Sequence, residues 1–93
     1  MKRIFKYPLK ADDRQVIAIP KGSKVLSVIE QHEQIVLYAL VEDSELAHTD
    51  LKVIIHGTGH PAYDVSDFEF VGSVKLCHGT LVFHVFCDRL EVD

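Results

Sequence analysis

The chain has 93 residues, of which 47% are hydrophobic, and it carries a formal net charge of −4. This length predicts a single domain spanning residues 1–93, because hydrophobic cores divide only in much longer chains. The acidic balance argues against general nucleic-acid binding, which depends on Lys and Arg neutralising phosphates. No apolar run approaches the roughly 20 residues that span a bilayer, and the charged start does not resemble a secretory signal. We therefore expect an intracellular protein with no membrane association.

Short apolar or alternating segments follow one another along the chain, separated by turn residues, which is the pattern of β-strands. Segment 35–41 is apolar on both faces and should be a central strand. In segment 24–32, alternation places Val25, Ser27 and Ile29 on one face of the strand and Leu26 and Val28 on the other. The predicted strands are 2–9, 15–19, 24–32, 35–41, 51–57, 68–76 and 80–86.

About seven strands at close spacing, with no long segment of helical period, predict an all-β domain. A small antiparallel β-sandwich or a partly open barrel is the natural closure. The mean hydropathy of +0.10 is high for so small a domain, and several strands are apolar on both faces. We therefore expect some apolar surface to be buried between subunits of a homo-oligomer.

The segment IIHGTGHPAYD, residues 54–64, combines a strand end with histidines and glycines. Gly57 and Gly59 flank Thr58, so the backbone could turn successive N–H groups toward an anion, with the Thr58 hydroxyl as a further donor. His56 and His60 would add charge when protonated. The spacing matches neither a Walker loop nor a dinucleotide fingerprint. A tight turn without a ligand explains the same residues equally well.

The triplet His-Gly-Thr occurs twice, at His56 and at His78. Paired His-x-Thr motifs on neighbouring strands are typical of two-histidine phosphoesterases, where one imidazole acts as base and the other as acid. Those enzymes are larger α+β proteins with an apolar middle residue. Two unrelated turns are the simpler interpretation, and a phosphoesterase using His56 and His78 is the enzymatic alternative.

Cys77 and Cys87 are the two cysteines, and both lie in apolar, strand-like surroundings. They are best interpreted as reduced, buried thiols. Zinc binding by these cysteines with His78 and His84 is the weaker alternative, because regular strands do not bring the four donors together. The pair His56 and His60 lacks the glutamate and the helix of a zincin. We therefore expect neither a metal nor another cofactor.

The run LVFHVF, residues 81–86, places His84 on a face with Val82 and Phe86. A histidine in such a position is usually a hydrogen-bonded core or interface residue. Alternatively it lines a pocket in which Phe86 and Tyr63 stack on a base or ring. No serine has a plausible His and Asp pattern around it, so nucleophilic catalysis has no support in the sequence.

Four stretches, IFKYPL, IPKGSKVLSV, IIHGTGHP and LVFHVF, together resemble a family of short phage and prophage proteins of unassigned function. The resemblance covers residues 4–86. It implies a phage accessory protein that acts in the host bacterial cytoplasm, and it supplies no catalytic residues.

We therefore expect a non-catalytic counter-defence protein that sequesters a small phosphorylated or nucleotide ligand, or that blocks a host defence protein. A minor structural component of the virion is a further alternative. The residues expected to contact a ligand are His56, Gly57, Thr58, Gly59, His60, Tyr63 and His84.

Overall fold

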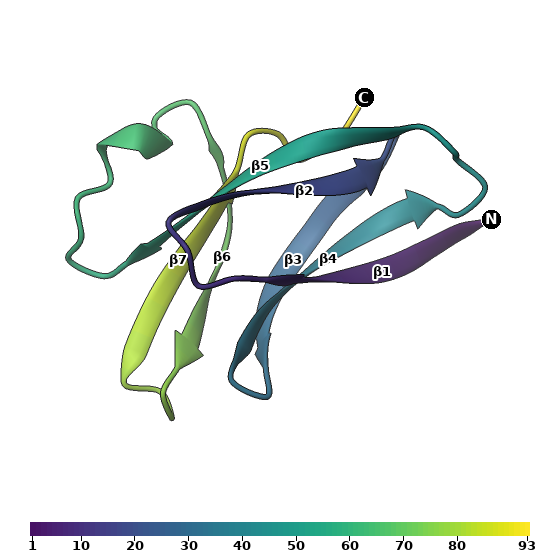
Figure 1. The fold of residues 1–93 in the computed structure, drawn as a ribbon. Coiled ribbons are helices and arrows are strands. Elements are labelled where there is room, and N and C mark those ends of the chain that lie inside the picture. The colour runs from purple at the N-terminus through teal and green to yellow at the C-terminus, as the bar shows by residue number, and fades with distance from the viewer.

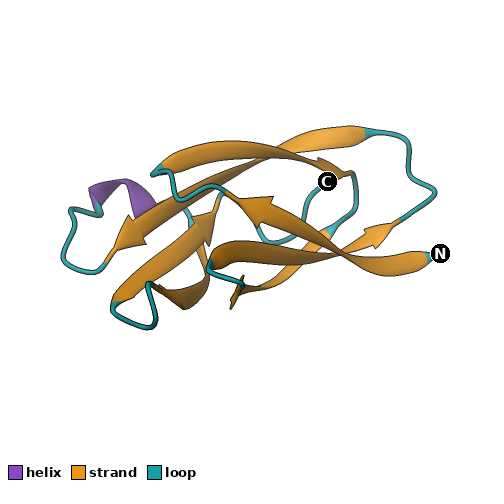
Figure 2. Ribbon diagram, turned by 60° about the horizontal axis from the view of Figure 1, so that its bottom comes forward, coloured by secondary structure: helices purple, strands orange, loops and turns teal.

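The computed structural model describes all residues 1–93 and shows seven strands and one short 3-10 helix (Figures 1 and 2). The strands form two antiparallel sheets that pack face to face, so the predicted β-sandwich is confirmed and the sheets do not close into a barrel. The elements are β1 (Lys2–Leu9), β2 (Arg14–Pro20), β3 (Lys24–Gln31), β4 (Gln34–Glu42), β5 (His48–Gly57), η1 (Tyr63–Val65), β6 (Glu69–Leu76) and β7 (Leu81–Cys87).

The two sheets differ in size. One has three strands in the order β1-β4-β3, and the other has four in the order β2-β5-β7-β6. Strand β4 is central in its sheet, as its doubly apolar sequence predicts. The C-terminal residues return to β3, where the Val25 N–H donates to the Leu90 carbonyl at 2.7 Å. The backbones of Lys24 and Glu91 form an isolated antiparallel β-bridge beside it. This return fixes the C-terminal residues to the start of β3.

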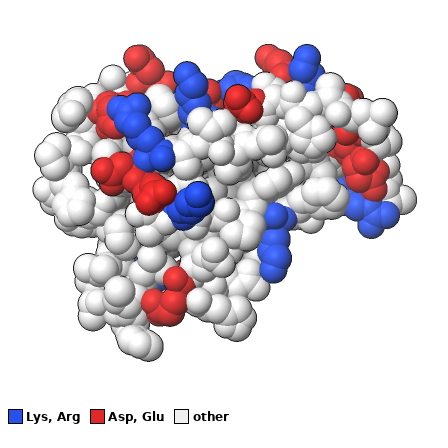
Figure 3. All heavy atoms as spheres, viewed as in Figure 1, with Lys and Arg blue, Asp and Glu red and all other residues white.

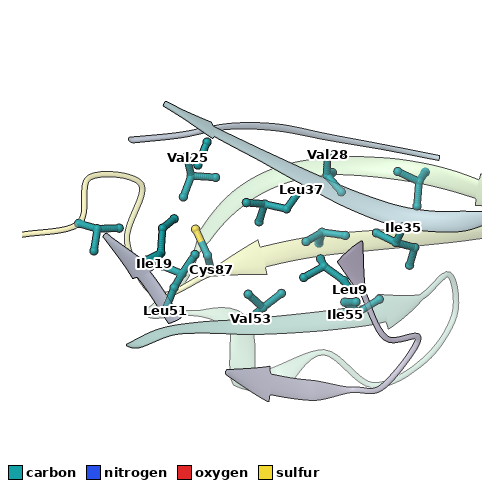
Figure 4. Packing of buried hydrophobic residues seen from close by; sticks show 14 of the residues in the cluster. Leu9, Ile19, Val25, Val28, Ile35, Leu37, Leu51, Val53, Ile55 and Cys87 are labelled. Atoms are coloured by element: carbon teal, nitrogen blue, oxygen red, sulfur yellow. The ribbon is translucent and has the colours of Figure 1, made fainter. Parts of the chain in front are cut away.

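The core lies between the sheets and is built from alternate residues of the paired strands (Figure 4). Leu37 is completely buried on β4, and Leu51 and Val85 are completely buried on the facing sheet. Cys87 is also buried there, and this burial raises the pKa of its thiol to about 11. The strand period of two therefore identifies the inward face of β4, β5 and β7 directly.

Strand β3 departs from the predicted alternation. Its pairing with β4 shifts register between Val25 and Ser27, so Val25 and Val28 are buried while Ser27 and Ile29 are exposed. The prediction that Val25, Ser27 and Ile29 share a face is wrong, because an irregularity inserts an extra residue and reverses the faces beyond it.

Cys77 lies in the tight turn between β6 and β7 and is exposed, so the prediction of two buried thiols is wrong for this one. Cys77 and His78 both have positive φ, at 54° and 56°. The carboxylate of Glu33, in the β3–β4 turn, accepts hydrogen bonds from the backbone N–H groups of Cys77 at 2.6 Å and His78 at 3.2 Å. These bonds lower the pKa of Glu33 and connect the two turns.

The surface mixes charges of both signs (Figure 3). It also retains several exposed apolar side chains. The most exposed large ones include Ile4 at 62%, Leu46 at 91% and Tyr63 at 88%. None of the structure's elements is an apolar helix of membrane-spanning length.

Candidate functional site

The segment between β5 and β6 folds back over the four-stranded sheet, on the face turned away from the core. His56, near the end of β5, places its Nε2 atom 2.7 Å from Asp64 Oδ1 on helix η1. The second oxygen of Asp64 accepts a hydrogen bond from Arg14, at the start of β2, at 2.9 Å. One carboxylate therefore fixes the loop to two neighbouring strands.

This carboxylate is well shielded. The side chains of His56 and Asp64 are only 12% and 16% exposed, whereas that of Arg14 is 67% exposed. The hydrogen bond from His56, with smaller contributions from the charges of His56 and Arg14, lowers the pKa of Asp64. Asp64 therefore acts as a fixed negative anchor, and most of the Arg14 guanidinium remains open to solvent.

A hollow of about 340 Å³ opens beside this pair. It brings together three of the predicted ligand-binding residues, His56, His60 and Tyr63, and five of its seven lining residues are charged or carry an imidazole. The sequence analysis did not select the other four lining residues. Pro61 and Asp64 lie within the segment 54–64 itself. Asp13 and Arg14 come from the start of β2, and nothing in the order of the chain indicates that this strand meets the loop after β5.

The predicted anion-binding turn at Gly57, Thr58 and Gly59 does not form. The Thr58 N–H donates to the carbonyl of Val82 at 3.1 Å, and the His60 N–H donates to the carbonyl of Gly57 at 3.1 Å. Only Gly59 has a positive φ, of 88°. The N–H groups of Thr58 and His60 are used to hold the turn, so the prediction that successive N–H groups converge on an anion is wrong.

Gly57 has a different role, because it makes room for a neighbouring ring. A Cβ atom at Gly57 would lie 3.0 Å from Cε1 and 3.2 Å from Nδ1 of His60. The missing side chain lets the His60 imidazole lie against the backbone where β5 ends.

His84 is directly opposite His56 in the β5–β7 register, but it does not line the hollow. Its Nε2 lies 2.8 Å from Thr58 Oγ1 and its Nδ1 lies 2.7 Å from Ser73 Oγ. Both ring nitrogens of His84 therefore have hydrogen-bond partners within the chain, and the ring is half-buried. Thr58 and His84 form a second polar cluster with Ser73, a residue that sequence reasoning missed.

The Thr58 hydroxyl has a second neighbour in this cluster, because its Oγ1 also lies 3.3 Å from the Val82 carbonyl. Thr58 thus connects the His84 ring to the backbone of β7.

His78 lies far from His56. It is in the turn beyond Leu81, and Leu81 is three residues, or about 10 Å of extended strand, from His84. No hydrogen bond joins His56 to His78, and no hollow is lined by both. The structure does not bring the two His-Gly-Thr triplets together.

The potential metal ligands are also dispersed. The structure contains no group of three or more His, Cys, Asp or Glu side chains arranged to hold a metal ion. Cys77 and Cys87 lie at opposite ends of the β6–β7 hairpin, since Leu76 pairs with Leu81 beside the turn while Glu69 pairs with Cys87 at the far end.

Neither a curated protein nor a solved structure matches this chain. One family model does, and it covers residues 1–92. Its description is "domain of unknown function (DUF7352)", and the match extends over almost the entire sandwich. The chain therefore belongs to the DUF7352 family.

Proposed function

We propose that this protein is a non-catalytic binding module that holds a small phosphorylated molecule of the nucleotide class in the hollow beside His56 and Asp64. The observation that carries the proposal is the combination at that hollow of an open guanidinium, Arg14, and an exposed aromatic ring, Tyr63. These are the two elements that a nucleotide requires: a cation for its phosphate and a flat surface for its base.

The donors are suited to a phosphate. One guanidinium nitrogen of Arg14 donates to Asp64. The other N–H groups of the planar guanidinium remain free to bind two phosphate oxygens at once. The ring of His60 has no hydrogen-bond partner within the chain and borders the same hollow. Tyr63, 88% exposed, offers a face on which a base stacks.

The hollow carries fixed charges of both signs. Asp13 and Asp64 contribute two carboxylates and Arg14 one guanidinium, and the imidazoles of His56 and His60 lie beside them. A phosphate bound there would therefore depend on Arg14 as its fixed cation.

The biological setting is part of the same proposal. The resemblance to phage and prophage proteins supports a counter-defence protein in the host cytoplasm that sequesters a nucleotide signal. Because His56 and His78 share no hollow, the geometry favours sequestration over the two-histidine phosphoesterase. The polar, open form of the hollow favours a small charged ligand over a purely apolar one.

Calorimetry with a panel of cyclic and linear nucleotides tests the proposal. We expect binding that is lost in Arg14→Gln and in Tyr63→Ala. Arg3→Gln is the matched control, because Arg3 is also an exposed arginine paired with an aspartate, Asp43. It is close in sequence to the N-terminus, which lies at the opposite end of the molecule from the loop between β5 and β6 (Figure 1). Absence of binding, or equal losses with Arg3→Gln, would show that the hollow is not a nucleotide site.

A further inference from the structure

We propose that β1 is a docking edge for an extended, acidic segment of a partner protein, which would add a fourth strand to the three-stranded sheet. This inference does not depend on the nucleotide hollow. It is based on the unequal sheets, the free backbone of β1, and the charges that β1 carries.

The sandwich is one strand short on the β1 side. Strand β3 packs against β6, so the other edges of the two sheets, β1 and β2, share the opposite side of the molecule. One sheet has three strands and the other has four. A strand added beside β1 would equalise the two layers.

Apolar side chains from both sheets remain accessible on this side. Phe5 pairs with the buried Ala39 and so faces inward, yet it is 41% exposed. Tyr7, on the same face of β1, and Ile17, on β2, pack against the core but are only partly buried. An added strand would bring its own inward side chains over these residues and remove apolar surface from water.

The backbone of β1 is available on its outer side. The strand pairs with β4 over its whole length, from Lys2 opposite Glu42 to Leu9 opposite Ile35, and with no other strand. Among the backbone hydrogen bonds outside the strand ladders, none involves β1. Half of its N–H and C=O groups therefore face solvent, which is the arrangement to which extended peptides add.

The charge of β1 indicates the chemistry of the partner. The strand carries Lys2, Arg3 and Lys6 and no acidic residue, in a chain whose net charge is −4. Arg3 is neutralised by Asp43, whereas Lys2 and Lys6 have no ion-pair partner. Both lysines lie on the outer face of the sheet with Ile4, 62% exposed, between them. A segment with acidic residues on either side of an apolar one would complement this row.

A second copy of the chain fits this edge less well. Two β1 strands paired with each other would gather the basic residues of both along one seam without an acid between them, and like charges across paired strands are destabilising. Pro8 also lacks the N–H that pairing needs near one end. The edge is therefore protected against self-association while it remains open to an acidic strand.

The test uses the full chain and two short synthetic peptides, one alternating glutamate with valine and the other alternating lysine with valine. Two-dimensional amide NMR at millimolar peptide would map the contact, and hydrogen exchange would report protection of the β1 amides. We expect the glutamate peptide to bind at β1, to protect its outer amides, and to bind more weakly as salt is added.

Charge reversal gives the decisive comparison. Lys2→Glu with Lys6→Glu should weaken glutamate-peptide binding by about tenfold and strengthen lysine-peptide binding. Lys52→Glu with Lys75→Glu, at exposed positions of the other sheet, is the control and should leave both affinities unchanged. The proposal is overturned if the glutamate peptide does not bind, if both peptides bind equally, if the shifts lie outside β1, or if β1 proves to pair with a second copy.

Discussion

Replacing Gly57 with alanine should displace the His60 ring at the hollow without lowering the stability of the fold. The new Cβ would lie 3.0 Å from Cε1 of His60, closer than an ordinary contact, so the ring must withdraw by a few tenths of an ångström. The ring can do so, because His60 is exposed and its imidazole makes no hydrogen bond. The φ of Gly57 is not in the left-handed region, so alanine fits its backbone without strain.

The expected change in the free energy of unfolding is therefore small and favourable. Alanine restricts the unfolded chain, which at a compatible position stabilises a protein by about 0.4–1 kcal/mol. Gly59→Ala is the matched control with the opposite sign, since its φ of 88° forces a left-handed alanine that costs about 1–2 kcal/mol. No atom lies within 4 Å of a Cβ at Gly59, so this control introduces backbone strain without a steric clash.

Urea denaturation would measure both changes, and proton NMR of the His60 imidazole would report its displacement. We expect Gly57→Ala to keep wild-type stability or exceed it, to shift the His60 ring resonances, and to weaken nucleotide binding at the hollow. A loss of more than about 2 kcal/mol in Gly57→Ala would refute the reasoning, because it would show that the ring is held rigidly where the structure leaves it free to move.

Three further predictions concern the core, the thiols and the anchoring carboxylate. Leu37→Ala, at a fully buried site in the central strand, should lower the free energy of unfolding by about 2–5 kcal/mol in urea denaturation; a loss below 1 kcal/mol would contradict the packing seen here. A thiol reagent should modify Cys77 rapidly in the native protein and Cys87 only on unfolding, since burial raises the pKa of Cys87 to about 11; two fast thiols would contradict this assignment. The pKa of Asp64 is lowered in the folded state, so its carboxylate stabilises the fold above about pH 4 and loses this effect as the pH falls through the folded pKa. The stability advantage of the wild type over Asp64→Asn, measured by denaturation across pH, should therefore shrink in acid, and an advantage that grows in acid would contradict the ion pair.

Local patterning determined the class of fold and most of the strands. Alternation and turn residues are properties of short segments, so the strand boundaries at 2–9 and the central position of 35–41 are visible without tertiary information. The same local logic failed at β3, where one irregularity between Val25 and Ser27 reversed the faces beyond it. It also failed at Cys77, whose apolar surroundings in the sequence predict a buried thiol but which is exposed in the β6–β7 turn.

The candidate site was only half visible in the sequence. The chain itself draws attention to His56, His60 and Tyr63, because unusual residues cluster within one short stretch. The partners Arg14 and Asp64 reach them only through the pairing of β2 with β5 and the return of the loop over that sheet. Strand pairing between distant segments is set by the packing of the whole sandwich rather than by local preference. Tertiary structure therefore decided that His56 bonds a carboxylate, that His84 lies between two hydroxyls, and that the His60 imidazole has no hydrogen-bond partner.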